Sequence, residues 1–273
     1  MPRTLVSASL VLVASLVASR AAAGPGDAPP SSLVAQAVEY RDGETVLEGW
    51  LTYDTTFQGK RPGVLVVHEW WGLTDFPKRR AEALAKEGYV AFALDMFGKG
   101  KVTRDPKQAG AWAGEWRGPE HRDAARKRVQ AGWDVLAKHE RVDAARIAMM
   151  GFCFGGTVSL DTAWSGAPLK AAISFHGHPT SPTAEQMPGV KASILVCHGA
   201  DDAFVPAEMI AGFQESMKKA KTDWQFCVYA NAVHAFTNPD ADSHGIEGVK
   251  YEPKAAARSW ENALTFLRSA MGG

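Results

Sequence analysis

The segment from Met149 to Gly156 constrains the fold of this chain more than any other. Apolar residues run there directly into the pattern Gly-x-Cys-x-Gly-Gly, with Cys153 at its centre. A strand that ends in this pattern is typical of a nucleophile elbow, a sharp turn into a helix where glycine avoids Cβ clashes. The pattern predicts a thiol raised above a sheet at a helix N-terminus, whose dipole favours the thiolate. A buried structural cysteine among small helix-packing residues is the alternative.

Segments of two kinds alternate along most of the chain. Residues 34–40 and 45–53 flank the turn signal Asp42-Gly43 and predict a β-hairpin. The apolar runs that predict buried strands are 63–68, 89–95, 146–150, 171–175, 193–198 and 225–229. The stretches that predict helices are 74–87, 120–139, 156–164, 206–219 and 254–267, whereas 97–118 predicts a loop or cap. This alternation indicates an α/β fold: a mostly parallel central sheet with an N-terminal β-hairpin and helices on both faces.

The first residues have the pattern of an export signal. Arg3, an apolar run over residues 5–18 and Ala21-Ala22-Ala23 follow the order of charged region, apolar region and cleavage site. We therefore predict a signal peptide at residues 1–23, a disordered lead-in at 24–33 and a single domain at 34–273. The mature protein is expected to be periplasmic or secreted, without a stable membrane anchor after cleavage. An uncleaved anchor is the alternative.

Composition narrows the classes of partner. The chain has 273 residues with a formal net charge of zero, and no basic run indicates a nucleic-acid partner. Its three cysteines leave at least one thiol free. Cys197 and Cys227 fall in neighbouring predicted strands and could form a disulfide; we expect two free thiols, because adjacent-strand geometry rarely suits a bridge. We expect a monomer that binds a small molecule.

Three polar residues fall at the carboxyl ends of predicted strands, in the order nucleophile, acid, histidine. That order is the chain order of the α/β-hydrolase triad. Cys153 comes first, Asp202 follows within Gly-x-x-Asp-x-x-Val-Pro with Asp201 as its competitor, and His234 comes last. In this interpretation His234 holds or receives the thiol proton and later protonates the leaving group, while Asp202 orients the imidazole. Alternatively, Asp202 caps the next helix and His234 is an ordinary loop histidine.

The loop after the first parallel strand, residues 68–73, adds a fourth element. In this fold that loop supplies a second oxyanion donor, so we expect the backbone N–H groups of Phe154 and Trp70 to bind the oxyanion. Glu69 is an unusual neighbour for a nucleophile, since a carboxylate there could accept the thiol's hydrogen bond or adjust its ionisation. A solvated loop glutamate is the alternative.

Together these motifs resemble the dienelactone hydrolase family. The segments that carry the resemblance are 68–72, 151–156, 202–206 and 234–236, and the likeness extends over about residues 34 to 270. The resemblance implies one α/β-hydrolase domain that uses no cofactor and opens enol-lactones or cleaves related esters through an acyl-cysteine. It implies that Cys153, His234, Asp202 and Glu69 are catalytic, with the glutamate holding the resting thiol and releasing it to histidine when substrate binds.

The resemblance also identifies departures in the substrate pocket. Two arginines of the best-known members, which bind a substrate carboxylate, are replaced here by Asn238 and Trp112. Arg104 and Arg117 could substitute for them. The side chains that we expect to contact substrate are Trp71, Trp112, Phe204, Phe236 and Asn238. An aromatic pocket that also includes Trp70 and Trp116 would suit a neutral or bulkier ester or lactone, unless these tryptophans only pack the core and cap.

Two rival functions remain open from the residues alone. The same elbow chemistry would serve another acyl transfer, such as thioester or short peptide cleavage. A catalytically silent binding protein on this fold is the other, although it predicts loss of a triad member and the sequence shows none lost.

Overall fold

The computed structural model describes residues 1, 32–116 and 118–272. Ser32–Gly273 forms one compact unit. The predicted signal peptide, nearly all of the predicted lead-in and Arg117 lie outside the described residues. Among the described residues, no helix is long and apolar enough to cross a membrane.

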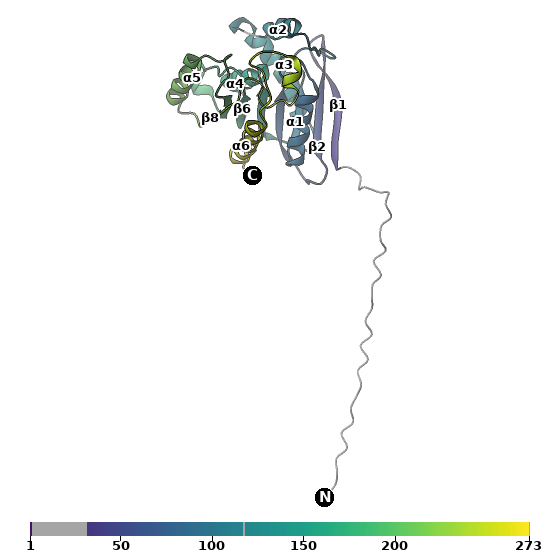
Figure 1. Cartoon of the computed structure of the whole chain (residues 1–273). Coiled ribbons are helices and arrows are strands. Elements are labelled where there is room, and N and C mark those ends of the chain that lie inside the picture. Colours follow the sequence, from purple (N-terminus) through teal and green to yellow (C-terminus); the bar gives the residue numbers. More distant parts are fainter. Residues whose placement is uncertain (2–31, 117, 273) are drawn as a thin grey trace. The chain divides into compact units, whose positions relative to one another are not determined.

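An eight-stranded sheet forms the centre of this unit, in the order β1-β2-β4-β3-β5-β6-β7-β8. The strands are β1 (Leu33–Asp42), β2 (Thr45–Asp54), β3 (Arg61–Val67), β4 (Val90–Leu94), β5 (Val142–Phe152), β6 (Ala171–Phe175), β7 (Ser193–Gly199) and β8 (Trp224–Tyr229). The hairpin β1–β2 is antiparallel and joins β4 antiparallel, while every pair from β4 to β8 is parallel. In Figure 1 the hairpin and β8 lie at opposite ends of the sheet. The predicted α/β fold with its N-terminal hairpin is confirmed.

Helices cover both faces of the sheet. They are α1 (Asp75–Lys86), α2 (Pro106–Gly114), α3 (Arg122–Ala137), α4 (Phe154–Trp164), α5 (Ala207–Ala220) and α6 (Pro253–Met271). Within the described residues, the short 3₁₀ turns are η1 (Pro119–His121), η2 (Met187–Gly189) and η3 (Ala241–His244). Apolar residues of α1 and α6 share one core cluster, and those of α3, α4 and α5 share the other.

The core is built from the period-two alternation of the strands. In β3, Leu65 and Val67 point into the cluster under α3 and α4, while Val64 and Val66 point into the cluster under α1 and α6. All four side chains are fully buried. A strand buried on both faces reads as a continuous apolar run, which is why the central strands could be predicted from sequence.

β5 and α2 are among the elements that differ from their predictions. β5 begins at Val142, before the predicted start, and pairs with β3 across an irregularity between Pro62 and Gly63. The segment predicted as a loop or cap contains α2. Its start is fixed by the Asp105 side chain, which accepts a hydrogen bond from the Lys107 N–H, and by proline at the first helical position.

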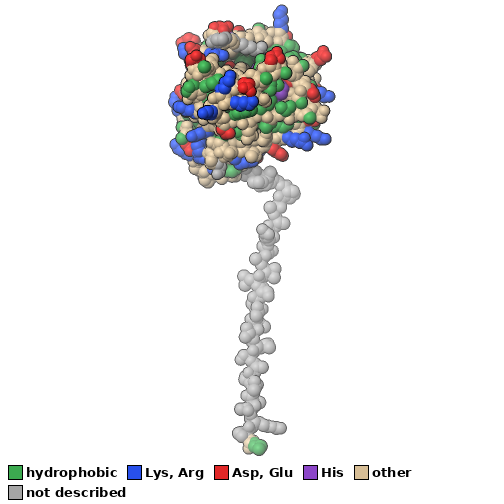
Figure 2. Space-filling model, turned by 90° about the vertical axis from the view of Figure 1, so that its left-hand side faces the viewer, with side chains coloured by type: hydrophobic (Ala, Val, Ile, Leu, Met, Phe, Trp, Pro, Cys, Tyr) green, Lys and Arg blue, Asp and Glu red, His purple; other side chains and the backbone are tan. Residues whose placement is uncertain are grey.

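The two cysteines outside the elbow are free thiols, and the surface carries charges of both signs. Cys197 and Cys227 are directly paired in register across β7 and β8, and both are free thiols. Cys197 is buried, whereas Cys227 is only partly so. On the face seen in Figure 2, basic, acidic and apolar side chains are interspersed without a broad patch of one sign.

Candidate active site

Cys153 lies at the sharp turn between β5 and α4, in a backbone conformation that L-residues rarely adopt. Its φ is 54° and its ψ is −116°. Two contacts of its N–H help to hold the turn: the Phe175 carbonyl at 3.0 Å and the His176 Nδ1 at 3.1 Å. A Cβ at Gly151 would lie 2.0 Å from the Gly155 carbonyl oxygen, so the turn requires glycine there. The elbow expected from the sequence is present.

A chain of close contacts connects Cys153 to a histidine and a carboxylate from other strand ends. The His234 Nε2 lies 3.0 Å from the Cys153 Sγ, and the His234 Nδ1 lies 2.9 Å from the Asp202 Oδ2. The competitor Asp201 is exposed. α5 begins without a side-chain cap, so the alternative role of Asp202 as a helix cap is wrong.

The neighbours of His234 determine its charge. Burial lowers the pKa of the imidazole, but the adjacent Cys153 sulfur and the Asp202 carboxylate outweigh burial and raise it to about 10. The ring is therefore an imidazolium at neutral pH. Because the imidazolium Nε2 lies against the Cys153 sulfur, the arrangement can supply both a sulfur nucleophile and a proton donor.

Glu69 is buried beside this group rather than solvated. Its side chain is 2% exposed, and its Oε2 accepts a 2.7 Å hydrogen bond from the Asn238 Nδ2. Burial raises the pKa of Glu69 to about 7, although the bond from Asn238 and the nearby His234 lower it. The alternative of a solvated glutamate is therefore wrong. Glu69 contacts Asn238 while the Cys153 sulfur contacts His234, so the expected contact between the glutamate and the resting thiol is not present.

The two expected oxyanion donors belong to backbone segments that pack against each other. Phe154 is the first residue of α4, a position whose N–H has no partner within the helix. Trp70 belongs to the loop after β3. A Cβ at Gly155 would lie 2.4 Å from the Val67 carbonyl oxygen and 2.6 Å from that of His68, so glycine allows α4 to approach this loop.

A cavity of about 750 Å³ opens over these residues. Its lining at the reacting end includes Cys153, His234, Glu69, Trp70 and Phe154. The other apolar and aromatic side chains around it are Trp71, Trp116, Val158, Pro179, Phe204, Met209, Ala235, Ile246 and Val249. Its polar side chains beyond the reacting end are Arg122, Thr157, Asp161, His178, Thr180 and Ser181. A mostly apolar cavity with few polar groups suits a small organic ligand.

The five side chains expected to contact substrate divide into two groups. Trp71 and Phe204 line the cavity. The Trp71 ring stacks on His244, with the ring centroids 4.0 Å apart, and the Phe204 ring meets His234 edge-on at 5.3 Å. Trp112, Phe236 and Asn238 do not line it. Trp112 packs against Phe97, Phe236 is fully buried between His176 and Tyr229, and Asn238 holds Glu69.

His176 is a buried residue of the site whose role the sequence did not reveal. Burial holds its pKa well below the usual range, so the ring is neutral. Because its Nδ1 accepts the Cys153 N–H, its Nε2 carries the hydrogen and donates to the Thr237 Oγ1 at 2.8 Å. The ring thus connects the elbow to the loop that carries Asn238. A histidine directly after a buried strand was the available signal.

Asp161 was also missed, although helical spacing could have found it. Cys153, Thr157 and Asp161 occur at intervals of four residues and all line the cavity. The Thr180 hydroxyl accepts a hydrogen bond from the Trp164 Nε1 and donates to the Asp161 Oδ1 at 2.8 Å. Burial raises the pKa of Asp161. Within the part of the chain that the structure describes, no group of three or more His, Cys, Asp or Glu side chains could hold a metal ion.

The chain is similar to known proteins over most of its length. A protein of Aquifex aeolicus named "Putative carboxymethylenebutenolidase" is 29% identical over 241 residues, 86% of this chain and 98% of that one. A Bradyrhizobium protein named "Probable 2-oxo-3-(5-oxofuran-2-ylidene)propanoate lactonase" is 29% identical, over 77% of this chain and 84% of its own. The crystal structure of P91, a dienelactone hydrolase-like promiscuous phosphotriesterase from metagenomic libraries, is 38% identical. It superposes with a TM-score of 0.83 over 88% of this chain and 99% of its own.

These likenesses establish that the chain has the α/β-hydrolase fold. The model of the dienelactone hydrolase family matches residues 48–271, from the second strand of the hairpin into the last turns of α6. Because this match covers most of the chain, the protein is a member of the dienelactone hydrolase family, a family of hydrolases.

Proposed function

We propose that this hydrolase cleaves small neutral esters or lactones through an acyl-cysteine. The observation that carries the proposal is the Cys153–His234–Asp202 chain, with contacts of 3.0 and 2.9 Å, open to a largely apolar cavity. The ionisation of His234 supports it, since an imidazolium beside the sulfur is ready to protonate a leaving group.

The reaction then has two halves. The Cys153 thiolate attacks the carbonyl carbon, and the N–H groups of Phe154 and Trp70 bind the oxyanion. As the carbon–oxygen bond of the ester breaks, His234 gives its Nε2 proton to the leaving oxygen. A water molecule next attacks the acyl-cysteine, His234 accepts a proton from that water, and collapse of the second oxyanion releases the acid and the thiolate. Asp202 keeps the imidazole in one orientation throughout.

The cavity lining supports a neutral, ring-bearing substrate. Trp70, Trp71, Trp116 and Phe204 offer aromatic surfaces, and neither Asn238 nor Trp112 supplies a carboxylate-binding group to the cavity. Arg122 and Asp161 bring one positive and one negative side chain to the lining. We therefore propose a substrate without net charge. A polar group of this substrate, remote from the scissile bond, would contact Arg122 and Asp161.

The first test is hydrolysis of a panel of aryl esters and lactones by the purified chain. We expect Cys153→Ala to lower turnover on the order of 10⁴-fold or more, as loss of a nucleophile does in a triad enzyme. Cys227→Ala removes a partly buried thiol that does not line the cavity and should leave turnover unchanged. Neutral substrates should be preferred over carboxylate-bearing analogues. Full turnover by Cys153→Ala would refute the proposal.

The same panel separates the rival functions. Thioesters and short peptides test the other acyl transfers, because they use the same elbow chemistry. Wild-type protein that hydrolyses nothing, and whose Cys153 does not react with iodoacetamide, would support a silent binding protein instead.

Phosphotriester cleavage is a second candidate activity. The similar protein P91 is described as a promiscuous phosphotriesterase, and an uncharged phosphotriester would suit a largely apolar cavity of about 750 Å³. A neutral dialkyl aryl phosphate, added to the panel, tests it by release of the phenol. Release that persists in Cys153→Ala would exclude this site as its source.

We also propose that the protein is exported and monomeric. The basis for export is the residue pattern of 1–23 alone. N-terminal sequencing of the protein from the producing cell should begin near Gly24, and an intact Met1 would contradict export. Light scattering should give the mass of one chain.

A further inference from the structure

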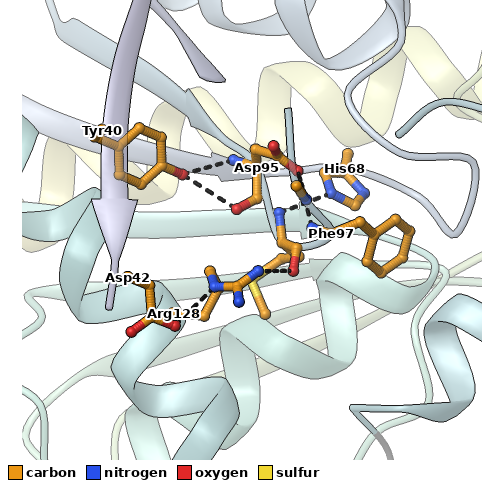
Figure 3. A network of polar contacts seen from close by, with 8 residues as sticks. Tyr40, Asp42, His68, Asp95, Phe97 and Arg128 are labelled. Atoms are coloured by element: carbon orange, nitrogen blue, oxygen red, sulfur yellow. Dashed lines mark hydrogen bonds and ion pairs between the residues drawn. The ribbon is translucent and has the colours of Figure 1, made fainter. Parts of the chain in front are cut away.

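The loop that carries Glu69 and Trp70 is held by a buried histidine that the proposed mechanism does not use. His68 follows β3 directly and is fully buried. Its ring meets Phe97 edge-on at 4.7 Å and lies 6.1 Å from the Phe154 ring. Figure 3 shows this ring at one end of a network of polar contacts that reaches back to the hairpin.

The hydrogen-bond partners of His68 determine its tautomer. Burial lowers its pKa, so the ring is neutral and carries one hydrogen. The Met96 N–H donates to its Nε2 at 3.1 Å, which makes that nitrogen an acceptor. The hydrogen must therefore lie on Nδ1, which donates to the carbonyl oxygen of Glu69 at 2.5 Å.

That carbonyl belongs to the same peptide unit as the Trp70 N–H. In a planar trans peptide the C=O and N–H bonds point in opposite directions. A carbonyl held toward the His68 ring therefore directs the Trp70 N–H away from it. We propose that His68 is a positioning residue. Together with the Gly72 N–H, which donates to the same oxygen at 3.3 Å, it holds the Glu69 carbonyl and so aims the Trp70 N–H at the oxyanion.

A network of hydrogen bonds fixes the backbone whose Met96 N–H donates to the His68 Nε2. Arg128 donates through Nη1 to the Met96 carbonyl at 2.7 Å and through Nε to Asp42 at 2.9 Å. The Asp95 Oδ1 accepts the N–H groups of Phe97 and Gly98.

The hairpin reaches the same segment through Tyr40. The Tyr40 hydroxyl accepts the Asp95 N–H at 2.9 Å and donates to the Asp95 carbonyl at 3.1 Å, as Figure 3 shows. The backbone around Met96 is thus held from several sides, so its N–H keeps the His68 ring in one tautomer and one orientation.

Two substitutions separate the two nitrogens of His68. The amide nitrogen of asparagine lies as many bonds from Cα as Nδ1, so His68→Asn retains a donor for the Glu69 carbonyl and loses the acceptor for Met96. The amide oxygen of glutamine reaches the place of Nε2, so His68→Gln retains the acceptor and loses the donor. Each variant removes one hydrogen bond from the same buried position, which makes them matched controls for each other.

The proposal rests on the proposed function and is tested by steady-state kinetics on the best ester of the panel. We expect His68→Gln to lower kcat about 100-fold, the cost of removing one oxyanion donor, with KM nearly unchanged. His68→Asn should stay within about threefold of wild type, because the donor is retained. A neutral aryl aldehyde, which adds to the Cys153 thiolate as a hemithioacetal, should likewise bind His68→Gln about 100-fold more weakly.

Unfolding midpoints and pH profiles complete the test. The basic limb of the pH profile should not move in either variant, since neither touches His234. Equal loss of kcat in the two variants, or a loss that follows only their unfolding midpoints, would overturn the positioning role. Absence of Cys153-dependent hydrolysis in wild type would instead refute the proposed function, so the two failures are distinguishable.

Discussion

The His234 imidazole lies between a sulfur and a carboxylate, and these two neighbours rather than its own chemistry set its charge. An isolated histidine loses its proton near pH 6.5, whereas here the pKa is about 10. The same microenvironment contains Glu69, whose pKa burial raises to about 7. The site therefore has a fixed cation and a carboxyl group that titrates close to neutrality.

The charge of His234 predicts the basic limb of activity. A raised histidine pKa means that the imidazolium is present below pH 10 and lost above it, so kcat/KM should fall above about pH 10. Asp202→Asn removes one cause of the shift. In Asp202→Asn we expect the basic limb of kcat/KM to lie at lower pH than in wild type. We also expect kcat/KM to be lower by up to about 10⁴-fold, the cost of this change in a serine triad.

Rates from about pH 6 to about pH 11, corrected for spontaneous hydrolysis, measure both effects. Asp201→Asn changes the exposed neighbour and serves as the control. A limb that stays in place in Asp202→Asn would show that the carboxylate does not hold the proton on His234.

At the scale of single elements, the cavity runs along helix α4. Cys153, Thr157 and Asp161 line the cavity along one face of this helix. Eight residues of helix rise about 12 Å, so Asp161 lies about that far along the axis from Cys153. One carboxylate oxygen is held by the Thr180 hydroxyl, and a substrate bound at Cys153 must extend along two helical turns to reach the other.

This arrangement predicts selectivity for a hydrogen-bond donor at the far end of the substrate. Wild type should prefer a naphthyl ester with a distal hydroxyl over the unsubstituted ester, and Asp161→Asn should reduce that preference roughly tenfold, the value of a hydrogen bond to a charged group. The ratio of the two kcat/KM values is the measurement. Asp123→Asn, on an exposed position of α3, is the control. An unchanged ratio in Asp161→Asn would contradict the role.

Sequence patterns predicted these elements well where burial produces a repeating pattern. The central strands are apolar on both faces, and the strand predicted at 171–175 coincides with β6. Order along the chain was enough to predict that Asp202 and His234 lie together, because parallel strands present their carboxyl ends at one edge. α2 was missed because glycine and tryptophan obscured its apolar spacing, although Asp105 and Pro106 marked its start.

The substrate contacts could not be predicted equally well. Phe236 and Asn238 lie close to His234 in sequence, yet the left-handed backbone at Ala235, with φ of 57°, turns the chain immediately after the histidine. Phe236 therefore enters the core and Asn238 reaches Glu69. Such turns depend on packing between distant segments, which a local pattern does not contain.

At the scale of the whole molecule, the sheet concentrates buried polar groups at one edge and makes stability depend on their protonation. Glu69 is the clearest case. Its pKa is about 7 in the folded protein and 4.5 as the reference value. Between these pH values the folded state keeps a proton that the unfolded chain releases, so this group makes stability fall as pH rises.

We expect Glu69→Gln to remove that dependence. The shift corresponds to about 3 kcal/mol, since one pKa unit is worth about 1.4 kcal/mol. Relative to wild type, the free energy of unfolding of Glu69→Gln should therefore rise by about this amount between pH 4.5 and pH 7. Denaturant titrations at the two pH values measure the difference, with the exposed Glu261→Gln as control. A constant difference at both values would refute the raised pKa.

The backbone of Cys153 carries a consequence for how such a chain can change over time. A non-glycine residue at a φ of 54° and ψ of −116° costs on the order of 1–3 kcal/mol. Glycine would adopt this conformation more easily. A lineage selected only for a durable fold would thus drift toward glycine at this position, and a reactive side chain is retained there only while its chemistry has a use.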